Sequence, residues 1–242
     1  MRKYKCEKIF PAMLAFLLLT MLIGCSSPGP DPGELIAKAQ LAISEVESYR
    51  IEMPITITQN GKTTQSTSQG EFVSPDRLHM IKTDEDGNRE SIRIGQTEYD
   101  RNADSNNWEV HQIPESLPFA NPAVIILEEL DSLAGLVAMP DEAVDSVDCF
   151  HYKGSIDPLQ DLREMVAKES NPKRKESLQQ TLEMQEQMEM SVVVEVWIGK
   201  DDYLMRQHHW TLSQKFEGTA MEATAIWKFY DFNEPVEIEP PL

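Results

Sequence analysis

The chain has 242 residues, of which 40% are hydrophobic, which is enough for one domain with a sizeable core. Acidic residues outnumber basic ones by 41 to 22, and the formal net charge is −19. A surface of this sign disfavours binding to nucleic acid and electrostatic adhesion to anionic lipid.

The N-terminus carries the pattern of an exported lipoprotein. Four basic side chains within residues 2–8 precede an apolar run over residues 9–23, as in a secretory signal peptide. The run is shorter than the ~20 residues that a membrane-spanning helix needs. Its end, Met21-Leu22-Ile23-Gly24-Cys25, resembles a bacterial lipobox, in which the cysteine is lipidated and becomes the first residue of the mature protein. The alternative is an ordinary signal peptide with an incidental cysteine.

We therefore predict a signal peptide over residues 1–24, a tether over residues 25–30 and a single domain over residues 31–242. Two or more acyl chains on Cys25, such as palmitate, would hold the protein stably on a membrane. We expect a lipid-anchored protein on the extracytoplasmic face of a cell membrane. Cys149 then has no partner for an intrachain disulfide, and we interpret it as a small buried hydrophobe and not as a nucleophile.

The first half of the domain is predicted to be one helix followed by strands. Asp31 can cap a helix that begins at Pro32, and apolar residues follow at helical spacing as far as Val46. From Tyr49 the apolar residues alternate with polar ones, and Pro54 suggests an edge position or a bulge. Asn60-Gly61 predicts a hairpin turn. Further strands of an antiparallel meander are predicted over residues 62–73, 77–83, 91–94, 98–101 and 108–111.

The middle of the chain is predicted to be helical. Asn121-Pro122 opens an apolar run to Val137 that covers more than one helix face, so we expect this helix to be buried on several sides or to lie against something apolar. After a strand over residues 149–155, a second helical stretch begins at Asp157-Pro158 and is interrupted at Asn171-Pro172. The remaining elements are strands over residues 192–198, 203–212 and 219–232, and an extended tail over residues 237–241.

Three segments resemble a family of lipid-carrying bacterial lipoproteins, the LppX/LprG-like group, and the wider family of carriers with the LolA-type fold. They are residues 94–101 followed by Trp108, residues 194–206, and residues 229–238. The resemblance implies an α+β fold in which a strongly curved antiparallel sheet, a half-barrel, has helices covering its concave face. It also implies a hydrophobic cavity between sheet and helices that accepts acyl chains.

The apolar helix after Asn121 is a natural cover for such a sheet. Burial of CH₂ groups at ~0.8 kcal/mol each would give a long acyl chain on the order of 10 kcal/mol. The alternative is a closed core that the same side chains fill. The candidate lining residues are Ile51, Met53, Ile55, Ile125, Leu130, Leu133, Val194, Val196, Met221 and Trp227.

Other candidate sites carry weaker patterns. His208 and His209 are neighbours on a predicted strand and point to opposite faces, so they cannot easily hold one ion together, and we expect ordinary surface roles. Met184 and Met188 share a helix face, where adaptable packing is favoured over binding of a soft metal. Lys173-Arg174-Lys175 is interpreted as a solvated turn, with contact to lipid headgroups as the alternative. We predict no catalytic residue, no metal and no cofactor.

The sequence thus predicts a non-enzymatic, membrane-anchored lipoprotein that binds or carries a lipid or acylated molecule. A lid helix would shift, acyl chains would enter the cavity and the polar head would stay near its mouth. The alternative is an interaction or sensor module with a closed core and an envelope protein as partner. A solute-binding protein is disfavoured, because such proteins have two α/β lobes and this chain has an antiparallel pattern.

Overall fold

The structure is a computed structural model that describes residues 29–102, 104–131, 133, 135–216 and 218–241. The predicted signal peptide, the lipobox and Cys25 lie outside these residues and stay predictions. Within the described ranges, no helix is both long enough and apolar enough to cross a membrane.

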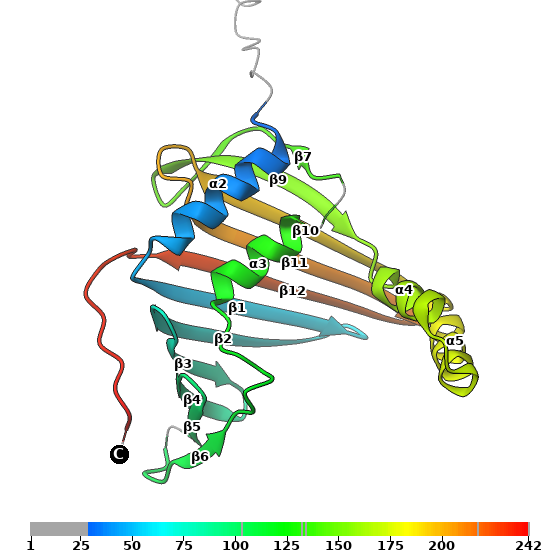
Figure 1. Cartoon of the computed structure of the whole chain (residues 1–242), viewed down its shortest axis with the longest axis horizontal. Coiled ribbons are helices and arrows are strands. Elements are labelled where there is room, and N and C mark those ends of the chain that lie inside the picture. The colour runs from blue at the N-terminus through cyan, green and yellow to red at the C-terminus, as the bar shows by residue number, and fades with distance from the viewer. Residues whose placement is uncertain (1–28, 103, 132, 134, 217, 242) are drawn as a thin grey trace, which may run out of the picture.

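One antiparallel sheet of twelve strands dominates the described chain, and it curves strongly without closing into a barrel (Figure 1). Its spatial order is β6-β5-β4-β3-β2-β1-β12-β11-β10-β9-β7, and β8 pairs with β9. The strands are β1 (Ser48–Gln59), β2 (Lys62–Val73), β3 (Arg77–Asp84), β4 (Gly87–Ile94), β5 (Thr97–Asn102), β6 (Glu109–Gln112), β7 (Val137–Ala138), β8 (Glu142–Val144), β9 (Val147–Ile156), β10 (Glu189–Gly199), β11 (Met205–Phe216) and β12 (Thr219–Tyr230).

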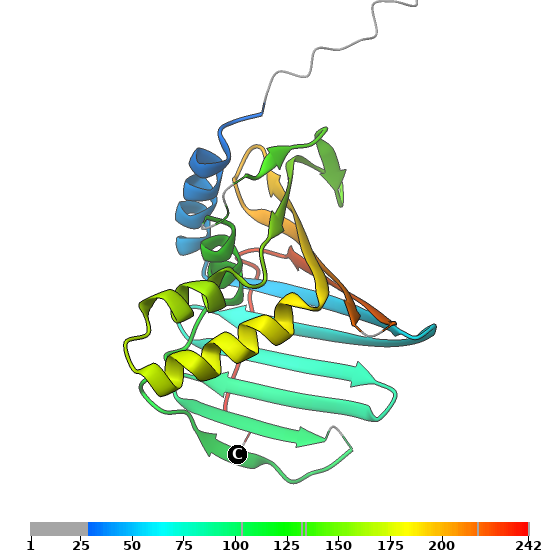
Figure 2. The ribbon, with the colours of Figure 1, turned by 90° about the vertical axis from the view of Figure 1, so that its right-hand side faces the viewer.

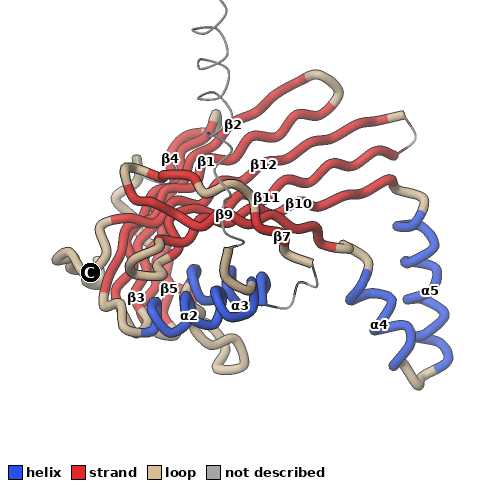
Figure 3. The backbone as a smooth tube through the Cα atoms, turned by 90° about the horizontal axis from the view of Figure 1, so that it is seen from above, coloured by secondary structure: helices blue, strands red, loops and turns tan. Residues whose placement is uncertain are grey.

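The helices of the described chain lie on the concave side of this sheet in two groups (Figures 2 and 3). One group is α2 (Pro32–Ser44) with α3 (Pro122–Asp131), and the other is the hairpin of α4 (Gln160–Lys168) and α5 (Pro172–Glu186). The two groups stand towards opposite ends of the long strands (Figure 3). The predicted α+β half-barrel with helices on its concave face is therefore confirmed.

The helix α2 forms as its sequence predicts. The Asp31 side chain accepts a hydrogen bond from the Glu34 backbone N–H at 3.2 Å, and Pro32 occupies the first turn. Leu35, Ile36, Ala39 and Ile43 recur at helical spacing and are all buried. This apolar face packs into one hydrophobic core together with α3 and the central strands.

Pro54 contradicts the expectation of an edge strand or a bulge. The strand β1 is central and pairs with β2 on one side and β12 on the other. Its register to β12 lapses at Met53 and Pro54 and resumes unchanged at Ile55. Proline has no backbone N–H, and it is tolerated at this position because the pairing with β12 is interrupted there and requires no hydrogen bond from residue 54.

The predicted apolar helix over residues 122–137 is wrong in length and in burial. The helix α3 ends at Asp131, and Val137 belongs to the short strand β7. Gly135 has a φ of +110°, which is incompatible with a continuing helix. Ile125 is 48% exposed, so α3 is buried on one side only.

The end of the chain also differs from its prediction. The strand β12 ends at Tyr230, and residues 231–241 form no strand, although the resemblance implied a terminal strand as far as residue 238. Asp231 and Asn233 have positive φ values of 51° and 60°, which turn the chain away from the sheet.

Candidate functional site

Alternation along the strands fixes which side chains face the helices. Tyr49 of β1 reaches Asn121, which directly precedes α3, so Ile51, Met53 and Ile55 point to the same concave side. The registers to β12 and β11 place further apolar side chains beside them. We call the following set the apolar strip: Met53, Ile55, Ile57, Trp210, Leu212, Ala223, Ala225 and Trp227.

Part of the concave face is closed. Directly beneath α3, Leu127 and Leu130 are 0% and 1% exposed, and they belong to the same buried cluster as Ile51 and Val194. These side chains fill the space under the helix at the packing of a protein core. The predicted cavity under residues 125–137 is therefore occupied by side chains of the protein itself where α3 packs.

The apolar strip extends past this closed part and remains open to solvent. Ile57 is 39% exposed, and the other members of the strip are half-buried. Ile55 and Ile57 line a pocket of about 260 Å³ together with Ser66 and Lys82. The strip lies on the side of the sheet on which the α2–α3 pair and the α4–α5 hairpin both stand (Figure 3).

The ten predicted lining residues divide between the core and the open face. Ile51, Leu130, Val194 and Val196 are buried in the core cluster, and Leu133 packs against it. Met53, Ile55 and Trp227 lie in the apolar strip, while Ile125 points outward from α3. Met221 lines a pocket of about 600 Å³ at the ends of β10 to β12. Five members of the strip were not among the predicted lining residues, although period-two alternation along β1, β11 and β12 could have identified them: Ile57, Trp210, Leu212, Ala223 and Ala225.

The α4–α5 hairpin is loosely attached compared with α2 and α3. None of the described residues of α5 is buried, and Met165 and Met184 are about half exposed. The packing role predicted for Met184 is therefore wrong, whereas Met188 accepts a hydrogen bond from the Gln214 side chain. The basic run over residues 173–175 forms the solvated first turn of α5, where Asn171 caps the helix.

The two adjacent histidines do point to opposite faces, but His208 is buried and does not have the surface role predicted for it. Burial lowers the pKa of His208 to about 4, and within the described chain its Nδ1 has no hydrogen-bond partner. On the other face, His209 packs against Trp197, and burial lowers its pKa as well.

Cys149 is fully buried, as predicted for a small hydrophobe. Its thiol donates to the Val147 carbonyl at 3.3 Å, and burial raises the pKa of the thiol. A raised pKa reduces the thiolate fraction, which is unfavourable for a nucleophile. Among the described residues, no group of three or more His, Cys, Asp or Glu side chains is arranged to hold a metal ion.

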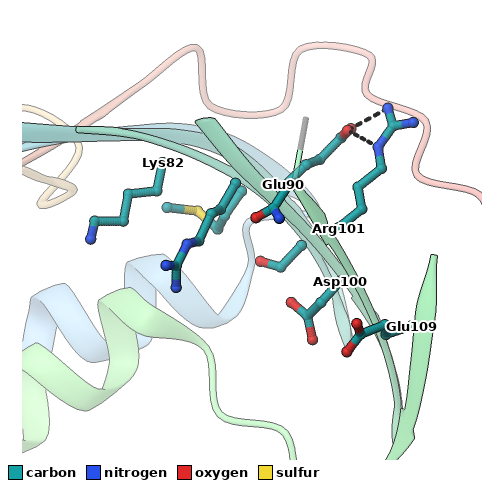
Figure 4. Close-up of a pocket in the computed structure, with 9 residues that line it drawn as sticks. Lys82, Glu90, Asp100, Arg101 and Glu109 are labelled. Atoms are coloured by element: carbon teal, nitrogen blue, oxygen red, sulfur yellow. Dashed lines mark hydrogen bonds and ion pairs between the residues drawn. The ribbon is translucent and has the colours of Figure 1, made fainter. Parts of the chain in front are cut away.

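A second feature of the concave face is a charged pocket of about 420 Å³ on β3 to β6 (Figure 4). Lys82, Asp100 and Glu109 lie on the side of the sheet that carries the helices, and the ion pair of Glu90 with Arg101 lies on the other side (Figure 4). Arg89 is opposite Lys82 in the register, so it shares the concave side. We call Lys82, Arg89, Asp100 and Glu109, with the Met80 and Ser91 side chains between them, the charged pocket.

Comparison with known proteins identifies the fold. No protein-family model and no curated protein matches the chain. Among solved structures, the lipoprotein LppX of Mycobacterium tuberculosis is similar over 87% of this chain and 99% of its own, with 14% identity and a TM-score of 0.51. LprF from Mycobacterium bovis has 9% identity and a TM-score of 0.47 over 89% of this chain and 99% of its own. A LolA superfamily protein from Nitrosomonas europaea has 7% identity and a TM-score of 0.30 over 84% of this chain and 93% of its own.

Of these similarities, the one to LppX is the strongest by TM-score, and at 14% identity it concerns the fold alone. It confirms the LppX-like fold that the sequence predicted. A shared fold does not determine the ligand, which depends on the side chains of this protein's own concave face.

Proposed function

We propose that this protein is a membrane-anchored, extracytoplasmic lipoprotein that binds or carries a lipid or acylated molecule along the apolar strip. Residues 1–24 would be removed as a signal peptide, Cys25 would carry the acyl anchor and residues 31–242 would form the carrier domain. We propose no catalytic step and no cofactor for it.

The observation that carries the proposal is an apolar face that continues beyond its helical cover. A contiguous set of partly exposed Trp, Ile, Leu and Met side chains is costly in water and is typical of a binding surface, even though Trp210, Leu212 and Trp227 also pack against the edge of the core. An acyl chain that lies along the strip would remove its own surface and that of the strip from water, which stabilises the complex by ~0.8 kcal/mol for each buried CH₂ group. Ordering of the chain and of the strip would subtract from this gain.

The element that moves on binding is the α4–α5 hairpin and not α3. Displacing α3 would expose Ile126, Leu127 and Leu130 at a cost of ~1.5–3 kcal/mol for each side chain. The described residues of α5 include none that is buried, and Leu159 at the start of α4 is buried, so the part of the hairpin beyond Leu159 can shift with little loss of packing. This assigns the predicted lid role to a different part of the chain.

A pair of variants on adjacent residues of β12 tests the proposal. Ala225 lies in the apolar strip between Ile55 and Trp210, and Ala225→Arg would lay a charged side chain across it. Thr224 points to the convex face, so Thr224→Arg adds the same group at nearly the same place without touching the strip. We expect Ala225→Arg to reduce uptake of a fluorescent fatty-acyl probe at least tenfold and Thr224→Arg to leave it unchanged.

Equal uptake by both variants, with both folded by circular dichroism, would place the ligand elsewhere. Native mass spectrometry of protein purified from cells provides an independent test, and we expect a co-purifying lipid. If no lipid is found, no probe is taken up and one envelope protein co-purifies in stoichiometric amount, the interaction or sensor module is the correct function.

A further inference from the structure

The concave face changes its chemistry in a fixed order from the centre of the sheet towards β6. The apolar strip occupies β11, β12 and β1, and the next strand, β2, presents the hydroxyl groups of Thr64, Ser66 and Ser68 to the same side. Beyond it lies the charged pocket on β3 to β6. Lys82 lines both this pocket and the pocket of Ile55 and Ile57, so the apolar and charged regions adjoin.

The charges within the pocket are sorted by strand. The register pairs Lys82 of β3 with Arg89 of β4, and it pairs Asp100 of β5 with Glu109 of β6. On the adjoining strands β4 and β5, Arg89 faces Asn102 and Asp100 faces Ser91, so the nearest cation and carboxylate are diagonal neighbours at ~7–8 Å. Positive charge therefore lies on the side of the apolar strip and negative charge on the side of the sheet edge.

These side chains are only partly engaged with the rest of the protein. Lys82 pairs with Asp84 at 2.8 Å, and the same carboxylate attracts Arg89 over a longer distance, but Arg89 forms no ion pair within 4.0 Å in the described part of the chain. Asp100 and Glu109 meet only the His111 imidazole there, at 3.8 and 3.9 Å. The guanidinium and the two carboxylates remain available for groups of opposite charge.

We propose that the charged pocket holds the headgroup of a zwitterionic phospholipid of the phosphoethanolamine type, whose acyl chains lie along the apolar strip. This inference rests on the proposed function and specifies its ligand. The phosphate meets Arg89 and Lys82, and the ammonium meets Asp100 and Glu109.

The order of groups in the lipid matches the order on the sheet. In such a lipid the acyl chains are followed by ester groups, then by the phosphate and finally by the ammonium. The sheet presents apolar side chains, then the hydroxyls of β2, then the cations and finally the carboxylates. An anionic lipid without the ammonium leaves Asp100 and Glu109 facing a headgroup of their own sign, which disfavours it.

The test is a competition between two lipids with identical acyl chains, phosphatidylethanolamine and phosphatidylglycerol, offered in equal amounts and read by native mass spectrometry. We expect the unmodified protein to take up phosphatidylethanolamine about fivefold more, as two exposed charge pairs allow. Asp100→Asn with Glu109→Gln should abolish the preference by lowering uptake of phosphatidylethanolamine relative to phosphatidylglycerol, and Arg89→Gln should weaken uptake of both lipids. Lys215→Gln, a charge removal on the convex face, should change neither.

The outcomes separate the two proposals. Uptake of both lipids without a preference, or a preference that survives Asp100→Asn with Glu109→Gln, overturns the headgroup assignment and leaves the carrier function standing. Absence of uptake of either lipid and of the fatty-acyl probe overturns the proposed function and the headgroup assignment together.

Discussion

The hydroxyl of Tyr49 fastens α3 to the sheet, and its removal should have a measurable cost. Tyr49 is fully buried, and its ring stacks on Phe72 with centroids 4.8 Å apart. Burial raises the pKa of Tyr49, so the hydroxyl stays a donor, and it donates to Asn121 Oδ1 at 2.5 Å. The same Oδ1 accepts the Ala123 backbone N–H at 3.0 Å at the start of α3.

Tyr49→Phe keeps the ring and removes only the hydroxyl. Because Asn121 Oδ1 retains the Ala123 N–H, the acceptor is not left unpaired, and we expect a loss of about 1 kcal/mol in the free energy of unfolding. Asn121→Ala loses both bonds and the cap of α3, for a loss of about 2 kcal/mol. Tyr49→Ala, which also empties the ring site, should cost ~3–5 kcal/mol.

Urea unfolding of the single and double variants gives the coupling between the two side chains. We expect the double variant to lose about 0.5–1 kcal/mol less than the sum of the single losses, because both remove the same hydrogen bond. If Tyr49→Phe is neutral and the two losses simply add, the hydroxyl does not hold α3, and the description of α3 as a fixed cover is wrong.

Three further predictions concern other parts of the chain. Burial lowers the pKa of His208 from 6.5 to about 4, so between these pH values the unfolded chain binds a proton that the folded protein does not. The free energy of unfolding should therefore fall as the pH drops through this interval, by up to ~3 kcal/mol. Urea titrations at several pH values should show that this part of the fall is missing in His208→Leu. Gly70→Ala would place a Cβ 2.2 Å from the His79 carbonyl oxygen, so the free energy of unfolding should fall by ~1–3 kcal/mol. Ser68→Ala on the same face is a milder control. A Gly70→Ala variant as stable as the unmodified protein would show that β2 and β3 separate freely at this point. Cys25→Ser should move the protein to the soluble fraction and abolish its labelling with palmitate, and unchanged membrane association would refute the predicted anchor.

Local sequence patterns predicted most of the elements because their causes are local. Asn60-Gly61 occupies the turn between β1 and β2 with φ values of 52° and 77°, which is what this residue pair favours. Asp31 caps α2 for a similar reason. The end of α3 was missed because apolar residues continue to recur after Asp131 as far as Val137, and apolarity alone does not distinguish a helix from a strand.

The candidate site was harder to predict because it depends on pairing between distant strands. Ile51 and Ile55 have the same pattern in the sequence, yet one lies in the closed core and the other in the open strip, since helices cover only part of the face. In the charged pocket, Arg89 and Glu109 each look like ordinary solvated side chains. Only the register across four strands assembles them into a sorted group.

The sheet that carries both surfaces has two free rims. A closed barrel fixes its bore by strand number and tilt, but this sheet ends at β6, whose four residues are all exposed, and at β7, which has only two. Such a wall can flatten or tighten without breaking a ladder bond. Under the proposed function, the sheet would then select poorly among ligands by the thickness of their acyl portion, and selectivity would depend on the polar end of the ligand.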